Sequence, residues 1–323
     1  MSKPQVFITR RIPEAGIRLL EASCEVRINP DDRPLARAEL LAAVAEADGV
    51  IGLLTDRIDA EFFGAAKQLR GYANYAVGFD NIAVAEATRR RIPVSNTPDV
   101  LTLATAELAW ALLFAVARRV VETDGVMHSG AWTGWGPLQF IGLDVTGKTL
   151  GIFGAGRIGQ AMARMSLGFA MPLLYCNRSP NPAMEELGAR RVSFDELLVE
   201  SDFISIHAPL TPQTRHVFNR AAFARMKRTA VLLNTARGPV IKEDDLVAAL
   251  REGLIAGAGL DVYEFEPRMA EGLAACPNAV LLPHVGSATR SSRDGMAELA
   301  AKNLLAMLDG TRPPTILNPE VLG

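Results

Sequence analysis

Short apolar runs separated by longer segments of helical periodicity constrain the fold of this chain more than any other feature. The runs are QVFIT, GVIGLL, GYANYA and IPVSNT in the first third, and TLGIFG, PLLYCN, FISIHAP, AVLLNTA, AGLDV and AVLLPH further on. Most lack polar–apolar alternation, which is typical of strands buried on both faces of a parallel sheet. Helical segments between them, such as EDDLVAALREG, fit the crossovers of βαβ units. The sequence therefore predicts an α/β fold with doubly wound parallel sheets.

Two such sets of strands predict two domains, which the length of 323 residues allows because single cores stop growing at roughly 250–300 residues. The proline-containing turn NTPDV follows the first set and leads into LTLATAELAWALLFAVARRVV. That segment contains Glu107 and is short for a membrane span, so we interpret it as a buried helix.

The last predicted helix, Ser291 to Gly310, has one apolar face and starts with the capping-box-like SSRD. A single helix is too small to be a domain, and we expect it to pack on the first set of strands. The predicted domains are therefore residues 1–98 with 289–323, and an inserted domain of residues 99–288.

Composition restricts the classes of partner. The net charge of −2 and the isoelectric point near 6.2 indicate no basic surface for nucleic acid or anionic membranes. Cys24, Cys176 and Cys276 are scattered and form neither a disulfide framework nor a metal-binding motif. The first apolar run is too short for a signal peptide. We expect a protein of a reducing compartment, the cytoplasm, with no metal site.

The segment KTLGIFGAGRIGQAMARM carries Gly154, Gly156 and Gly159 in G-x-G-x-x-G spacing between a predicted strand and a predicted helix. In that context Gly154 allows a tight turn, Gly156 lets the backbone approach a pyrophosphate, and Gly159 lets helix and strand pack closely. The helix N-terminus then stabilises the phosphate charge. A glycine-rich turn without a ligand is the alternative, and the strand–turn–helix context favours a dinucleotide cofactor.

The residues after the next strand indicate which dinucleotide is bound. Asn177 lies eighteen residues after Gly159, where an acidic residue would bind the adenosine ribose, and Arg178 and Ser179 follow it. An aspartate would repel a 2′-phosphate, whereas this trio offers it donors and positive charge. We therefore expect NADP(H) to be preferred over NAD(H). The alternative is that Arg178 only stacks on the adenine or lies in solvent.

Three further residues follow strands of the second set: Arg237 in LLNTARGPV, Glu266 in LDVYEFEP, and His284 in LLPHVGSAT. Ligands of open α/β sheets bind at the carboxyl ends of strands. Arg237 offers a fork that matches a carboxylate, and Glu266 could orient His284 and stabilise its imidazolium form. Each residue alone could be an ordinary surface charge or, for His284, a satisfied core histidine. Their shared placement predicts a site for proton transfer.

The motifs AVGFDNI, TAELAWALL, GAGRIGQ, HAPLTPQT, LNTARG, LDVYEFEP and LPHVGSAT closely resemble those of the D-isomer-specific 2-hydroxyacid dehydrogenase family, nearly from end to end. WTGWGPL, NRS and ILNPEVLG resemble its glyoxylate/hydroxypyruvate reductase branch. The resemblance implies a Rossmann domain inserted into a discontinuous flavodoxin-like substrate domain. It also implies homodimers that associate through the inserted domain and its long apolar helix. In this family the residues that match Arg237, His284 and Glu266 bind the substrate, transfer the proton and support the histidine.

The resemblance assigns further residues by motif. Val77 and Gly78 would bind the substrate carboxylate through their N–H groups, Leu53 and Leu54 would line the pocket, and Trp135 would restrict the partner subunit's pocket or pack in the interface. Asp261 would bind the nicotinamide carboxamide. The remaining cofactor positions would be Arg157, Ile158, Pro209, Thr214, Thr235, Ala236, Gly286 and Ser287. The clearest departure from the wider family is Asn177, where an acidic residue is usual.

The resulting hypothesis is NADPH-dependent reduction of glyoxylate or hydroxypyruvate to glycolate or D-glycerate. A longer 2-oxo acid such as 2-ketogluconate is the alternative substrate. Glu266 argues against formate dehydrogenases, which carry glutamine beside their histidine. A nucleotide-sensing corepressor of the same fold is the alternative outside enzymes, and it would be expected to carry extra peptide-binding or disordered segments. Turnover of NADPH with a 2-oxo acid distinguishes the two classes.

Overall fold

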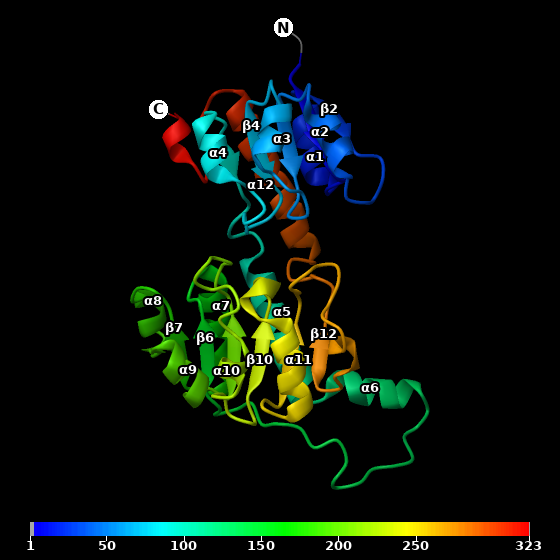
Figure 1. The fold of residues 1–323 in the computed structure, drawn as a ribbon, viewed down its shortest axis with the longest axis vertical. Coiled ribbons are helices and arrows are strands. Elements are labelled where there is room, and N and C mark those ends of the chain that lie inside the picture. The colour runs from blue at the N-terminus through cyan, green and yellow to red at the C-terminus, as the bar shows by residue number, and fades with distance from the viewer. Residues whose placement is uncertain (1–2, 323) are drawn as a thin grey trace. The chain divides into compact units, whose positions relative to one another are not determined.

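The computed structural model describes residues 3–322 (Figure 1). The chain divides into two compact units, one made of Met1–Leu101 with Ala288–Gly323 and the other of Thr102–Ser287. Each unit is an α/β layer structure built on its own parallel sheet. This confirms the fold class that the apolar runs predict.

The first unit contains a five-stranded sheet in the order β2-β1-β3-β4-β5, the flavodoxin-like order. Its strands are β1 (Gln5–Ile8), β2 (Glu25–Ile28), β3 (Gly49–Gly52), β4 (Gly71–Asn74) and β5 (Val94–Ser95). Its helices are α1 (Glu14–Glu21), α2 (Arg37–Val44), α3 (Ala60–Ala65), α4 (Val84–Arg89) and α12 (Arg290–Leu308).

The C-terminal helix α12 packs on α1, β3 and β4, as expected for the helix that follows the second set of strands. Its backbone passes so close to α1 that a Cβ at Gly16 would lie 2.4 Å from the carbonyl oxygen of Ala297. The predicted start at SSRD is wrong, because Thr289 is the N-cap and its side chain accepts a hydrogen bond from the N–H of Ser292.

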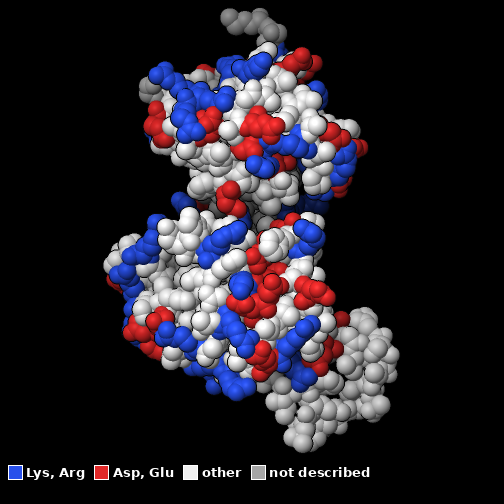
Figure 2. Space-filling model, in the orientation of Figure 1, with Lys and Arg blue, Asp and Glu red and all other residues white. Residues whose placement is uncertain are grey.

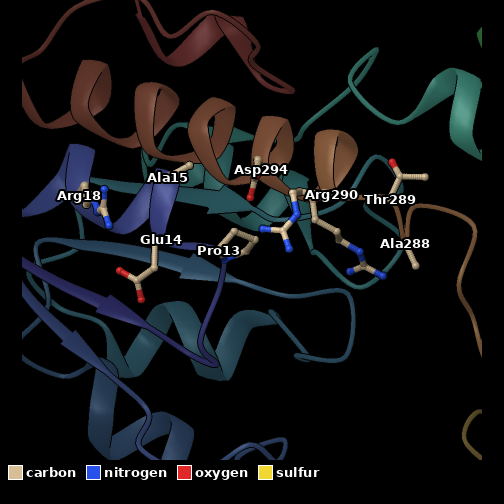
Figure 3. Close-up of a pocket in the computed structure, with 9 residues that line it drawn as sticks. Pro13, Glu14, Ala15, Arg18, Ala288, Thr289, Arg290 and Asp294 are labelled. Carbon is tan, nitrogen blue, oxygen red and sulfur yellow. The ribbon is translucent and has the colours of Figure 1, made fainter.

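A cavity of about 670 Å³ lies in the first unit where α1 and α12 begin (Figure 3). Arg18, Arg290 and Arg293 lie along it together with the carboxylates of Glu14 and Asp294. Charges of both signs therefore share this cavity. On the face shown in Figure 2, basic and acidic side chains are likewise interspersed, in keeping with the net charge of −2.

The second unit contains a seven-stranded sheet in the order β12-β11-β10-β9-β6-β7-β8. Its strands are β6 (Leu150–Phe153), β7 (Leu173–Cys176), β8 (Arg190–Arg191), β9 (Phe203–Ile206), β10 (Val231–Asn234), β11 (Gly257–Leu260) and β12 (Ala279–Leu281). Its helices are α5 (Thr102–Ala117), α6 (Val120–His128), α7 (Arg157–Met165), α8 (Pro182–Glu185), α9 (Phe194–Glu200), α10 (Arg220–Phe223) and α11 (Glu243–Glu252). The chain order reverses between β6 and β9, which is the dinucleotide-binding point of a Rossmann sheet.

Both faces of the seven-stranded sheet are covered, which explains why its strands are apolar without alternation. Leu232 of β10 packs in a core with α9, α10 and α11, while its neighbours Val231 and Leu233 pack in a second core with α5 and α7. The buried-helix interpretation of the segment after residue 100 is confirmed, since Trp110 and Leu112 of α5 belong to that second core. Among the described residues, no helix is both long and apolar enough to cross a membrane.

Two edge strands, β2 and β8, are absent from the sequence prediction. β2 reads EVRI with every side chain at least partly exposed, and β8 is the pair Arg190–Arg191, both exposed. An edge strand has only one neighbour, so charged side chains can remain in solvent while the backbone pairs. Such strands lack the apolar signal on which the prediction depends.

Candidate active site

Apart from Trp135, the predicted site residues of the second unit follow the parallel strands β6, β7, β9, β10, β11 and β12, whose carboxyl ends share one edge of the sheet. Gly154 follows β6, Asn177 follows β7, Arg237 lies three residues after β10, Asp261 follows β11, and His284 lies three residues after β12. Strands β10, β11 and β12 are adjacent, so the arginine and the histidine approach the same region.

The glycine-rich turn has the geometry that a pyrophosphate requires. Gly154 has φ +96°, and a Cβ there would lie 2.4 Å from the backbone nitrogen of Ala208. A Cβ at Gly159 would lie 2.4 Å from the carbonyl oxygen of Gly154, so helix and strand touch. At Gly156, the N-cap of α7, a Cβ would meet nothing within 4 Å, and no side chain caps the helix. The open space faces an uncapped helix N-terminus, which fits a dinucleotide phosphate.

Thr235 supplies a second observation that points to a ligand. Its hydroxyl is buried directly after β10, and no partner for it exists among the described residues. Buried hydroxyls are normally hydrogen-bonded, since leaving one unsatisfied costs about 1–3 kcal/mol. A polar group of a bound cofactor would satisfy it. The residues present therefore fit a nicotinamide dinucleotide.

The loop after β7 is organised by an arginine that sequence reasoning missed. Arg191 of β8 donates from Nη2 to the carbonyl oxygens of Asn177 at 3.2 Å and Arg178 at 2.8 Å. The Asn177 amide donates to the carbonyl oxygen of Ser179. Arg178 and Ser179 are exposed, and residues 177–182 contain no acidic residue. The loop therefore presents positive charge and donors and lacks a carboxylate of its own.

His284 and Glu266 form a direct pair, with His284 Nδ1 and Glu266 Oε2 2.9 Å apart. The other carboxylate oxygen, Oε1, accepts from the N–H of Tyr263 at 3.0 Å. Burial by itself would raise the pKa of Glu266. The hydrogen bond to His284, the Tyr263 N–H and the charge of Arg237 lower this pKa by more than burial raises it, so the net shift is downward. Glu266 is therefore an ionised acceptor for Nδ1–H, which leaves Nε2 as the ring atom that can transfer a proton.

Arg237 reaches the same region because of the glycine that follows it. A Cβ at Gly238 would lie 1.8 Å from the carbonyl oxygen of Tyr263, so only glycine allows this turn against the loop of Glu266. The Asn234 amide bonds the Arg237 carbonyl oxygen at 2.9 Å, and Arg237 Nη1 donates to the Ala236 carbonyl oxygen at 2.8 Å. The guanidinium thus lies half-buried near the His284–Glu266 pair.

Two residues hold the turn that carries His284, which has φ +56°. The buried Asp261 accepts from the N–H groups of Val285 and Gly286, each at 2.7 Å, one on each carboxylate oxygen. The Tyr263 hydroxyl donates to the Leu282 carbonyl oxygen at 2.8 Å, and burial raises the pKa of Tyr263 to about 12, so it stays a donor. Tyr263 is a positioning residue that sequence reasoning missed, although it lies within the LDVYEFEP motif.

The other predicted cofactor positions lie around the same strand ends. Ile158 is in the first turn of α7 beside Arg157, and Ala236 follows Thr235. In the loop after β9, the Thr214 hydroxyl donates to the carbonyl oxygen of Pro209 at 2.7 Å. Gly286 is buried, with its carbonyl oxygen accepting from Thr105 of α5.

Leu53, Val77 and Gly78 belong to the first unit. Leu53 follows β3, and its N–H donates to the buried Asp56 at 2.8 Å. Val77 and Gly78 lie in the loop after β4, where their carbonyl oxygens accept from Asn96 and Asn74, each at 2.8 Å. The backbone of both loops is thus fixed by buried polar side chains, as a backbone binding site requires.

Trp135 lies between α6 and β6 and is 82% exposed. Other large apolar side chains between residues 120 and 141 are exposed as well, and contiguous exposed apolar patches occur where partners bind.

Within the described residues, no group of histidine, cysteine, aspartate and glutamate side chains is arranged to hold a metal ion.

A Rossmann sheet, a phosphate-binding turn at its reversal point and a histidine–carboxylate pair beside an arginine define a nicotinamide-dinucleotide-dependent dehydrogenase. A family model described as the NAD-binding domain of D-isomer-specific 2-hydroxyacid dehydrogenases matches residues 110–286. The chain belongs to the D-isomer-specific 2-hydroxyacid dehydrogenase family, and it is an NAD(P)-dependent dehydrogenase. This confirms the resemblance seen in the motifs.

Individual relatives span nearly the whole chain. The glyoxylate reductases of Thermococcus onnurineus and Thermococcus kodakarensis are 52% and 53% identical to it, covering 99% of the chain and 97% and 98% of their own lengths. A solved structure of an NADPH-dependent glyoxylate/hydroxypyruvate reductase from Sinorhizobium meliloti, with NADP and malonate, matches with a TM-score of 0.88. That protein is 32% identical and is covered over 97% of its length, with 98% of this chain.

Proposed function

We propose that the protein reduces glyoxylate or hydroxypyruvate to glycolate or D-glycerate with NADPH. The names of the relatives support a small 2-oxo acid as substrate. The observation that carries the proposal is the Glu266–His284 pair at 2.9 Å with Arg237 beside it, at the carboxyl ends of three adjacent strands. It provides a proton donor and a carboxylate anchor in one place.

In the proposed reaction, Arg237 binds the substrate carboxylate and polarises the carbonyl group. When bound, the reduced nicotinamide supplies the hydride that adds to the carbonyl carbon. His284 donates its proton from Nε2 to the carbonyl oxygen as negative charge develops there. Glu266 holds the ring through Nδ1 and stabilises the charged imidazolium before the transfer. The product is the 2-hydroxy acid, and His284 is left neutral.

The cofactor preference rests on the loop after β7. Because residue 177 is asparagine, the loop has no carboxylate there to repel a 2′-phosphate, and Arg178 and Ser179 offer the phosphate a positive charge and a donor. Arg191 holds the loop through two carbonyl oxygens. The relative solved with NADP agrees with this chemistry. We expect a lower KM for NADPH than for NADH, and the reverse order would contradict the assignment.

For substrate binding, we propose that the N–H groups of Val77 and Gly78 bind the carboxylate and that Leu53 restricts the pocket.

We also propose a homodimer formed through the second unit, with Trp135 in the interface. Exposed apolar side chains around α6 support it: Val120, Val121, Met127, Trp132, Trp135, Leu138 and Ile141. Sedimentation analysis tests the dimer, and Trp135→Ala tests the interface.

The decisive experiment is steady-state oxidation of NADPH with a panel of 2-oxo acids. Fast turnover of glyoxylate and hydroxypyruvate is expected, and preference for a longer acid such as 2-ketogluconate would change the substrate assignment. Lack of turnover with every acid would favour a nucleotide-binding protein without catalytic activity. His284→Gln is expected to lower kcat by roughly 10²–10⁴, the usual scale for a general acid.

A further inference from the structure

Glu243, the first residue of α11, is a buried carboxylate that the proposed reaction does not use. It is 2% exposed, and glutamates are almost never buried to this extent unless they are paired. Its Oε1 accepts from the N–H of Glu264 at 2.8 Å, and its Oε2 accepts from the N–H of Ala270 at 2.7 Å. Both partners are therefore backbone groups of a single loop.

These two anchor points bracket the loop that carries Glu266. The Glu264–Ala270 segment leaves β11, presents Glu266 to His284, and is largely exposed between its anchors. An exposed loop has few contacts to fix it, so bonds at its ends determine how much it moves. The carboxylate of Glu243 spans both ends at once, which a neutral side chain with a single acceptor cannot do.

Glu264 completes the arrangement from the other side. Its Oε2 accepts from the N–H of Glu243 at 3.1 Å, so each glutamate binds the other's backbone. Its Oε1 lies 2.6 Å from His216 Nε2, within hydrogen-bonding distance. His216 thereby ties the same loop to the segment after β9. The loop of Glu266 is thus held to two parts of the second unit.

The arrangement has an electrostatic cost. Burial raises the pKa of Glu243, and the nearby charges of Glu264 and Asp244 raise it too, against the lowering effect of the two N–H donors. A well-packed apolar residue could fill such a site without burying charge. An apolar residue could not accept the two backbone hydrogen bonds that the carboxylate accepts, and these bonds fix the loop that carries Glu266.

We propose that Glu243 is a positioning residue for proton transfer, holding the Glu264–Ala270 loop so that Glu266 meets His284. The inference rests on the proposed function, because the step it supports is protonation of the substrate by His284. The Glu243 carboxylate bonds the backbone at both ends of the loop and not the side chains of His284 or Glu266, so it acts through the loop.

The test compares Glu243→Gln with Asp244→Asn, the same chemical change at an exposed position one residue away. Glutamine has one acceptor and places an NH2 group against one of the two N–H donors. We expect kcat for glyoxylate reduction to fall about 10- to 100-fold, the cost of misplacing a catalytic group by about 1 Å. KM for NADPH should stay unchanged, because the phosphate-binding turn follows a different strand. Asp244→Asn should match the unmodified protein.

Two readouts separate positioning from general damage. In Glu243→Gln, kcat should fall while KM for glyoxylate stays within about twofold, because Arg237 follows β10 and not the displaced loop. In a Glu266→Gln background, adding Glu243→Gln should cost less than threefold, since the residue it positions is already altered. Equal losses in both backgrounds, or a folded Glu243→Gln with unchanged kcat, would overturn the inference.

Glu264→Gln provides a milder variant if Glu243→Gln does not fold, and it should lower kcat with KM for glyoxylate unchanged in the same way. Its melting temperature and NADPH binding establish that it is folded. Absence of turnover in the unmodified protein with all 2-oxo acids would contradict the proposed function, whereas an unchanged variant of an active enzyme contradicts only the role of Glu243.

Discussion

Replacing Glu266 by glutamine should lower the rate of reduction. In the protein, one carboxylate oxygen accepts from Tyr263 N–H at 3.0 Å and the other faces His284 Nδ1 at 2.9 Å. Glutamine keeps one acceptor and replaces the other with a donor. If the amide nitrogen faces Nδ1, it favours the neutral tautomer with the proton on Nε2, and in either orientation the negative charge beside the ring is lost.

The size of the effect follows from the geometry. Charge centres about 4 Å apart interact by roughly 4 kcal/mol at an effective dielectric constant near 20. The two side chains are 29% and 31% exposed, so solvent screens the pair, and surface pairs retain about 1 kcal/mol or less. A value between these limits, about 1–3 kcal/mol, corresponds to roughly 5- to 150-fold in rate, since each 1.36 kcal/mol is a factor of ten.

The assay is kcat for glyoxylate reduction at saturating glyoxylate and saturating NADPH. The kcat of Glu266→Gln should lie about 5- to 150-fold below that of the unmodified protein, because the negative charge that supports the proposed proton donor is lost. Glu271→Gln, the same change at an exposed residue, serves as the control and should leave kcat in place. An unchanged kcat in a folded Glu266→Gln would show that the carboxylate does not support proton transfer, and the reasoning would fail.

Further predictions concern the loop after β7, the glycine-rich turn after β6 and stability in acid. Asn177→Asp should raise KM for NADPH at least tenfold relative to NADH by placing a carboxylate near the 2′-phosphate, and an unchanged ratio of the two constants would argue against that contact. Gly159→Ala should lower the free energy of unfolding by about 1–3 kcal/mol, because its Cβ would lie 2.4 Å from the Gly154 carbonyl oxygen. Gly64→Ala, where a Cβ meets nothing within 4 Å, is the control, and urea titrations compare the two. Asp202 binds Lys227 at 2.7 Å and the Thr149 N–H at 2.9 Å, and although burial opposes it, its pKa is lowered from 3.8. A lowered folded-state pKa contributes stability above the unfolded value, so Asp202→Asn should be less stable at pH 7. Its deficit should shrink as the pH falls below 3.8, and a deficit independent of pH would contradict the pairing.

The sequence alone determined the fold class and the central strands. Runs such as AVLLNTA are apolar throughout because Leu232 packs in one core while Val231 and Leu233 pack in another. Burial on both faces of the sheet therefore requires consecutive apolar residues, which can be recognised in the sequence. The glycine turn is equally local, since Gly154, Gly156 and Gly159 act within six residues. Arg237, Glu266 and His284 were identified because each follows a strand that could be recognised.

The tertiary structure decided what depends on contacts between distant segments. Strands β2 and β8 exist only because a neighbouring strand pairs with their backbone, as their exposed side chains carry no apolar signal. Arg191 of β8 donates hydrogen bonds to the carbonyl oxygens of Asn177 and Arg178 in the loop after β7. In EDDLVAALREG, Glu243 is indistinguishable from a solvated charge of a helix start, and only the loop folded over it gives it partners at residues 264 and 270. Burial and hydrogen-bond geometry are properties of the folded chain, so the contacts of Glu243 with the loop that holds Glu266 beside His284 are visible only in the tertiary structure.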